Sequence, residues 1–203
     1  NDNTTGGSNV AIGYGALAVN TTGGNNVAVG RNALDANTTA DDNTAVGMAA
    51  LGANTTGYHN TAVGRDAMTA NTTGIQNSAV GRNALDSNTT GSYNACSGTN
   101  ALTANTTGSN NSAFGKSALG SNTTANDNTA VGTYALGTNS TGQFNVGVGN
   151  SALYANTTSS YNTAVGNRAL PVNTAELNTA VGSLCMYSNT TGTQNTAIGQ
   201  ASL

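Results

Sequence analysis

A seventeen-residue unit repeats through almost the whole chain, and this period constrains the fold more than any other feature. The unit reads Asn-Thr-Ala-Val-Gly-x-x-Ala-Leu-x-x-Asn-Thr-Thr-Gly-x-x, with positions numbered 1 to 17 from the first asparagine. Position 1 is occupied by Asn9, Asn26, Asn43, Asn60, Asn77, Asn94, Asn111, Asn128, Asn145, Asn162, Asn178 and Asn195. A fixed period this short is typical of a solenoid, in which each unit forms one turn and contacts only its neighbours. We therefore predict a single continuous repeat array over residues 1–203, with about twelve turns.

One step of the array is sixteen residues long, because Asn173-Thr174-Ala175 lacks the second threonine of Asn156-Thr157-Thr158. We expect the deletion to lie at a corner or a strand end, which absorbs it. Both ends of the sequence fall inside a unit, whereas natural solenoids finish with atypical capping turns. This pattern favours a segment of a longer fibre.

Composition separates an ordered solenoid from a disordered chain. Charged residues make up 6% of the sequence and aromatic residues 4%, so an ordinary globular core is excluded. Low hydrophobicity is typical of disorder, but disordered chains usually carry high net charge or many prolines. This chain has a net charge of −3 and one proline, and its period is strict.

The unit predicts short strands rather than helices. No window places apolar residues at helical spacing, and Thr, Asn and Gly are poor helix formers. In an extended Asn-Thr-Ala-Val segment, positions 2 and 4 lie on one face. The fold class predicted is all-β, a parallel β-solenoid.

Two aliphatic columns are predicted to form the hydrophobic spine, one at position 4 and one at position 9. The spine residues are Val29, Val46, Val63, Val80, Val131 and Val165 at position 4, and Leu34, Leu51, Leu85, Leu102, Leu119 and Leu136 at position 9. Burial of two aliphatic side chains per turn contributes about 3–6 kcal/mol, against an ordering cost of roughly 25 kcal/mol for seventeen residues. Backbone ladders and stacked asparagines must therefore supply the remaining stability.

Asparagine and glycine columns are predicted to form the corners of each turn. Asparagine at positions 1 and 12 can bond its equivalents in adjacent turns and satisfy backbone groups. Glycine at position 5 has no exception, which indicates a positive φ or a close backbone approach. The corner ladder residues are Asn26, Asn43, Asn60, Asn77, Gly30, Gly47, Gly64 and Gly81.

The residue inventory argues against catalysis, cofactors and nucleic acid. His59 is the only histidine and occupies the variable position 17, and Asp41-Asp42 is the only local acidic pair, better interpreted as a solvated corner than a metal site. No Gly-Lys-Ser/Thr phosphate loop is present. Four cations at position 6 are too sparse for nucleic acid. Cys96 and Cys185 lie five turns apart, too far for a disulfide.

The Asn-Thr-Thr element has a structural and a functional interpretation. Structurally, threonine suits strands and asparagine suits corners. Functionally, the column forms a regular neutral array that could match ice or, because Asn-x-Thr sequons recur, carry glycans. The candidate array or glycan acceptor residues are Asn37, Asn54, Asn71, Asn88, Asn105, Thr56, Thr73, Thr90 and Thr107. The structural interpretation is favoured, because adjacent threonines point to opposite faces.

The first half of each unit resembles a known repeat. The segments Asn60-Thr61-Ala62-Val63-Gly64-Arg65-Asp66-Ala67 and Asn195-Thr196-Ala197-Ile198-Gly199 resemble head repeats of YadA-like trimeric autotransporter adhesins. The resemblance implies a left-handed parallel β-roll assembled as a trimer, and related repeats are similar to those of phage tail fibres and bacterial surface fibres. The family unit is shorter and lacks the Leu-x-x-Asn-Thr-Thr segment. The unit also resembles plant ice-binding β-rolls.

Together these features predict a non-enzymatic structural segment of an extracellular fibre or adhesin, at a cell surface or in a virion tail fibre. It would provide rigid extension and multivalent display. The expected partner is a second copy of the chain, in a trimer or an end-to-end filament, with a host surface, glycan or ice as further ligands. No cofactor is expected, and no apolar run is long enough to enter a membrane. The alternatives are an ice-binding solenoid that uses the Asn-Thr-Thr face and a self-assembling filament subunit.

Overall fold

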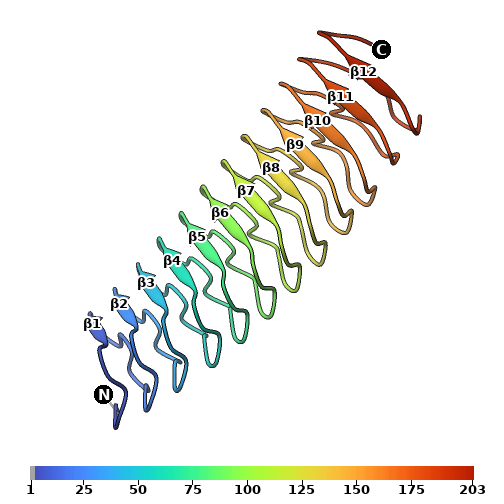
Figure 1. Ribbon diagram of the computed structural model, residues 1–203. Helices are drawn as coiled ribbons and strands as arrows, with labels where there is room; N and C mark the ends of the chain where they lie inside the picture. Colours follow the sequence, from blue (N-terminus) through green and yellow to red (C-terminus); the bar gives the residue numbers. More distant parts are fainter. Residues whose placement is uncertain (1–2) are drawn as a thin grey trace.

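The computed structural model describes residues 3–203, and within that range the chain is a β-solenoid with no helix. One strand of three residues occurs in each turn. The strands are β1 (Val10–Ile12), β2 (Val27–Val29), β3 (Thr44–Val46), β4 (Thr61–Val63), β5 (Ser78–Val80), β6 (Ala95–Ser97), β7 (Ser112–Phe114), β8 (Thr129–Val131), β9 (Val146–Val148), β10 (Thr163–Val165), β11 (Thr179–Val181) and β12 (Thr196–Ile198). They form one parallel sheet in sequence order, so the all-β parallel solenoid predicted from the period is confirmed (Figure 1).

Equivalent residues of successive units pair directly. Thr44 pairs with Thr61, and Val46 with Val63. The register survives the sixteen-residue step, because Thr163 of β10 still pairs with Thr179 of β11. The deletion lies outside the strands, between Asn173 and the start of β11. It is absorbed there because only a loop has to shorten.

Backbone hydrogen bonds join adjacent turns well beyond the strands. The amide of Leu51 donates to Ala67 O at 3.0 Å, and the amide of Thr55 donates to Thr72 O at 3.0 Å. The amide of Gln76 donates to Tyr58 O at 3.1 Å. Nearly the whole circumference of the coil therefore contributes to the ladder, which offsets the small amount of apolar burial per turn.

The interior is filled by small apolar side chains and by larger ones that are not branched at Cβ. Alanines at positions 3 and 8 and leucines or methionines at position 9 make up almost all of the buried apolar cluster. Leu34, Leu51, Leu85, Leu102, Leu119 and Leu136 are each 0% exposed. This column is the spine of the coil.

The predicted valine half of the spine is wrong. Position 3, not position 4, faces inward, and the valines lie half-buried or exposed on the outer face of the sheet: Val29, Val46, Val63, Val80, Val131 and Val165. The interior opposite the strand is too narrow for a branched side chain. At Gly147, which replaces the usual alanine, an added Cβ would already lie 3.3 Å from Leu136 Cγ. Positions 2 and 4 share a face as predicted, but that face points away from the core.

Backbone conformation separates the two aliphatic columns. Leucine at position 9 is left-handed, with φ values such as 51° at Leu102 and 50° at Leu136. Left-handed backbone is especially unfavourable for β-branched residues. Only Leu and Met therefore occupy position 9, whereas Val and Ile dominate position 4, where the backbone is extended.

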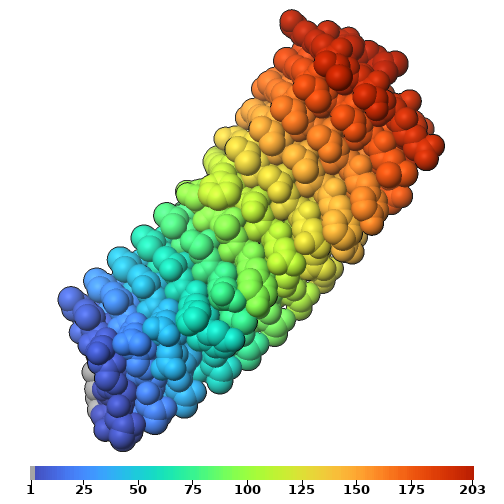
Figure 2. Space-filling view, viewed as in Figure 1, coloured from blue at the N-terminus to red at the C-terminus, as the bar shows by residue number. Residues whose placement is uncertain are grey.

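The stacked turns form an elongated rod whose two termini lie at opposite ends (Figures 1 and 2). Successive turns appear in Figure 2 as parallel bands across the rod. Among residues 3–203 the structure has no helix that could cross a membrane. The left-handed sense of the coil stays a prediction of the resemblance.

Candidate functional site

The asparagines at position 1 form a buried ladder that also anchors the neighbouring corner. Asn60 Oδ1 accepts a hydrogen bond from the backbone amide of Asn77 at 3.0 Å. Asn60 Nδ2 donates to Gly74 O at 2.8 Å, and the same carbonyl accepts from Asn71 Nδ2 at 3.0 Å. Asn26, Asn43 and Asn60 are all 0% exposed. This column is structural, because its polar atoms are already paired inside the coil.

The asparagines at position 12 form a second buried ladder, so their predicted role as glycan acceptors is wrong. Asn88 Nδ2 donates to Asn71 Oδ1, and Asn105 Nδ2 donates to Asn88 Oδ1, each at 2.8 Å. The Nδ2 atom that would carry a glycan is therefore paired and inaccessible in the folded chain. The same holds across the predicted set, which is 0% exposed: Asn37, Asn54, Asn71, Asn88 and Asn105.

Glycine at position 5 is required by both conformation and space. Its φ is 137° at Gly30, 140° at Gly47, 137° at Gly64 and 135° at Gly81, a region that side chains rarely adopt. A Cβ at Gly64 would lie 2.5 Å from Gly81 O of the next turn. The corner therefore excludes every other residue.

The two threonines of each unit play different roles. At position 13 the hydroxyl bonds the next turn, as where Thr72 Oγ1 donates to Thr89 O at 3.0 Å. At position 14 the side chains are exposed and make no side-chain hydrogen bond within residues 3–203. The exposed column includes Thr56, Thr73, Thr90 and Thr107. Only this one of the two threonine columns is free to meet a ligand.

The outer face of the sheet, formed by positions 2 and 4 of every turn, is uncharged from Val10 to Ile198. We call it the strand face. It carries Val, Ile, Thr, Ser, Ala and one Phe, and its larger side chains are exposed: Val80 by 42% and Phe114 by 45%. The face therefore combines a mainly aliphatic column at position 4 with mostly hydroxyl-bearing side chains at position 2.

Charges of opposite sign flank the strand face. Position 6, two residues after each strand, carries the exposed cations Arg31, Arg65, Arg82 and Lys116. Positions 16 and 17, just before each strand, carry the exposed acids Asp41, Asp42, Asp127 and Glu176. The face thus has a positive edge and a negative edge.

In the part of the chain that the structure describes, no group of three or more His, Cys, Asp or Glu side chains is placed to hold a metal ion. His59 Nε2 lies 3.3 Å from Asp42 Oδ2 at the surface, and Arg65 Nε donates to Asp66 Oδ2 at 2.8 Å. Burial raises the pKa of Asp35 and of Asp86 above the usual value.

The two cysteines are buried and free. Burial raises the pKa of the Cys96 thiol from 9.0 to about 12. Cys96 occupies the alanine column at position 3, and Cys185 the alanine column at position 8. Both take the place of a small apolar residue, and the Cys96 thiol, which keeps its proton, is a weak nucleophile.

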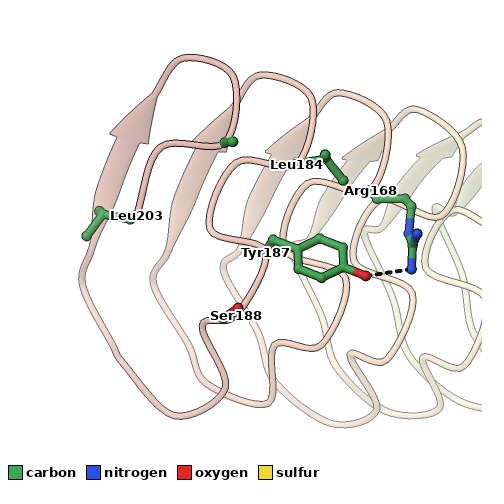
Figure 3. Close-up of a pocket in the computed structure, with 6 residues that line it drawn as sticks. Arg168, Leu184, Tyr187, Ser188 and Leu203 are labelled. Carbon is green, nitrogen blue, oxygen red and sulfur yellow. Dashed lines mark hydrogen bonds between the residues drawn. The ribbon is translucent and has the colours of Figure 1, made fainter.

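Hollows interrupt the regular surface of residues 3–203, and the lining residues of two of them are as follows. One, of about 400 Å³, lies beside the last turn between Arg168 and Leu203. Figure 3 shows Arg168 Nη2 donating to Tyr187 Oη, at 2.8 Å, beside it. Its far side is formed by Ala201 and Leu203, the last residues of the sequence. The other, of about 270 Å³, lies in the middle of the rod and is lined by residues of four turns. Neither was predicted from the sequence.

These features define the chain as a parallel β-solenoid repeat protein with an uncharged strand face. Compared with protein-family models, curated proteins and solved structures, the chain matches none of them.

Proposed function

We propose that the solenoid is a non-enzymatic structural rod of an extracellular fibre or adhesin, in which copies of the chain associate along the strand face. The composition of the strand face supports this proposal most strongly. The face is uncharged and partly apolar across all twelve strands, while charged side chains occur on both of its edges. None of the five basic and eight acidic residues of the chain lies on this face. Exclusion of charge is the property that an interface core requires.

The size of the strand face suits self-association. Twelve strands about 4.8 Å apart, each about 10 Å long, give a face of roughly 550–600 Å² per copy. Two such faces bury about 1,100–1,200 Å², close to the lower limit of about 1,200 Å² for stable complexes. The contact is therefore sufficient for a fibre in which several copies associate together.

The charged edges favour a parallel arrangement. Copies related by an axis along the rod place the positive edge of one beside the negative edge of the next. An antiparallel face-to-face pair would place like charges together, which is unfavourable. A parallel trimer is also what the resemblance of Asn60-Thr61-Ala62-Val63-Gly64 to YadA-like head repeats implies.

The oligomeric state tests this proposal. Light scattering after size exclusion should give a trimer or a larger assembly for the unmodified chain. The double variant Val80→Lys/Val131→Lys should be monomeric, because it places charges in the centre of the face. The matched control Thr73→Lys/Thr124→Lys adds the same charges on the exposed threonine column and should remain assembled. A monomer for the unmodified chain, or equal effects of the two variants, would contradict the proposal.

Ice binding is the second candidate, and the exposed position-14 threonines favour it. Their hydroxyls repeat once per turn and are not used inside the coil. A rigid, neutral column of this kind can order water along its length. Inhibition of ice recrystallisation by the unmodified chain, abolished in Thr73→Lys/Thr124→Lys and retained in Val80→Lys/Val131→Lys, would support this role. If the unmodified chain does not inhibit ice recrystallisation, the ice-binding role is contradicted.

A further inference from the structure

The central hollow arises from a local departure in the repeat. Position 10 varies along the chain, with Asp35, Gly52 and Thr69 in earlier turns, and it carries glycine in two successive turns only at Gly120 and Gly137. The missing side chains leave a groove of about 270 Å³ along the rod. The groove is lined by Asn100, Thr103, Ser117, Gly120, Ser121, Tyr134, Gly137, Thr138 and Tyr154. We call these residues the tyrosine groove.

Two exposed aromatic rings form one end of the tyrosine groove. Tyr134 and Tyr154 are 38% and 42% exposed, and their rings lie edge to face with centroids 6.3 Å apart. Tyr154 lies over Gly137, because a Cβ on that glycine would be only 3.1 Å from Tyr154 Cε2. The Tyr154 backbone carbonyl also accepts from Thr138 Oγ1 at 2.6 Å. The ring is therefore held in place while much of it stays open to solvent.

The remaining groove wall is polar but uncharged. It carries the hydroxyls of Thr103, Ser117 and Ser121 and the amide of Asn100. Asn100 Oδ1 is the one buried side-chain oxygen or nitrogen in residues 3–203 without a hydrogen-bond partner. Leaving an acceptor unpaired costs about 1–3 kcal/mol. Asn100 also lines the groove, so its amide is the lining group with an unused hydrogen-bond acceptor.

We propose that the tyrosine groove binds one neutral pyranose ring of a glycan. A sugar presents an apolar C–H face, which suits the exposed tyrosine rings, and hydroxyls that match neutral donors and acceptors. The residues that line the groove are themselves uncharged, which suits a neutral ligand. The cation Lys116 lies beside the groove, with its Nζ 5.7 Å from the centroid of the Tyr134 ring. The volume is slightly below the range of about 300–1,000 Å³ for ligand pockets, which suits a single ring rather than a longer buried chain.

The binding site is independent of the proposed assembly. The groove residues occupy positions 7, 10 and 11, whereas the strand face is formed by positions 2 and 4. The groove therefore lies outside the strand face, next to its positive edge, where Lys116 Nζ is 5.7 Å from the centroid of the Tyr134 ring. Each copy would contribute one site, and assembly would make sugar binding multivalent, which raises avidity without new contacts.

A steric block gives the sharpest test. Gly120 has no positive φ, and position 10 already holds tyrosine at Tyr154 and Tyr187, so Gly120→Tyr should fold while filling the groove. Gly52→Tyr places the same side chain at the same position four turns away and is the matched control. Circular dichroism and thermal melting establish that both variants keep the fold.

Binding is measured by saturation-transfer NMR with four uncharged probes: methyl β-glucopyranoside, methyl β-galactopyranoside, methyl α-mannopyranoside and N-acetylglucosamine. At least one should receive saturation on its C–H face from the unmodified chain and from Gly52→Tyr. Gly120→Tyr and Tyr154→Ala should weaken its affinity at least about tenfold, equivalent to about 1.4 kcal/mol. The proposal would be overturned by a lack of saturation transfer to any probe or by undiminished sugar binding to Gly120→Tyr. Equal losses of sugar affinity in Gly120→Tyr and Gly52→Tyr would also overturn it.

Discussion

The leucine column and the valine column are equally regular in sequence, yet they lie on opposite sides of the coil wall. Leucines at position 9 from Leu34 to Leu170 are 0% exposed, whereas Val80 and Val131 at position 4 are 42% and 39% exposed. The difference follows from the backbone, which turns Leu inward in a left-handed conformation and lets Val project from an extended strand. Repetition of an apolar residue therefore indicates a constraint, but not burial.

The comparison divides the unit into two sets of constraints. Inward positions hold alanine, leucine, asparagine and glycine because the interior of the coil is narrow and its polar groups must be paired. Outward positions on the strand face carry no charged residues, although packing of the core does not require this. The first set explains stability, and the second is the one that the proposed association along the strand face would explain.

The largest expected effect comes from placing the same polar residue in each column. Leu102→Asn buries an unpaired amide and leaves a cavity, so we expect a loss of about 4 kcal/mol in unfolding free energy. Val80→Asn should cost about 1 kcal/mol or less, because asparagine is merely unfavourable in a strand. Urea unfolding of both variants measures the difference. Equal losses would show that the assignment of inside and outside is wrong.

A smaller loss is expected at the corner glycine. Gly64→Ala forces a side chain into φ 137° and against Gly81 O, which should cost about 3 kcal/mol. The control Gly120→Ala has ordinary φ, and its Cβ would lie 3.2 Å from Ser117 O, so little change is expected. Thermal melting of the two variants shows whether the backbone conformation requires glycine at position 5 or whether glycine merely recurs there in the sequence. Comparable melting temperatures would refute the corner role.

The buried ladder should contribute less than the corner at any one position. Asn105 Nδ2 donates to Asn88 Oδ1 and to Gly108 O, so Asn105→Ala should cost about 2 kcal/mol. Thr107→Ala, in the same turn, removes an exposed hydroxyl and should change stability by less than about 0.5 kcal/mol. Chemical denaturation compares them directly. A large effect at Thr107 would mean that the exposed threonine column has a structural role after all.

The period alone predicted the solenoid, the parallel register and the asparagine and glycine corners, because each depends only on which residues recur. It did not predict which face of the strand is buried. Alternation places the side chains of positions 2 and 4 on one face, but it does not show whether that face points into the coil or towards solvent. Left-handed leucines were also missed, because non-glycine residues with positive φ are uncommon. One signal was available: Ile and Val never occur at position 9.

The tyrosine groove escaped prediction for a different reason. Position 10 is variable, and the sequence shows two successive glycines there, Gly120 and Gly137. The repeat does not predict where the outward side chains of the neighbouring turns point. Only the structure shows that Tyr154 covers Gly137 and leaves Gly120 open. The invariant positions determine the fold of the coil, and the variable positions create the groove that we propose as a binding site.

The smallest expected effect concerns Cys96, an interior residue that can acquire a charge. Its thiol has a pKa of about 12 in the folded chain and 9.0 ordinarily, so above pH 9 the unfolded chain loses a proton that the folded chain retains. A raised folded pKa means that stability present below pH 9 is lost as the pH rises towards 12. From pH 8 to pH 10 the unmodified chain should lose about 1.4 kcal/mol relative to Cys96→Ala. Alanine is the usual residue of this column, so the variant is a clean reference. Urea unfolding at both pH values provides the measurement, and parallel pH profiles would show that the thiol is accessible to water, contrary to its place inside the coil.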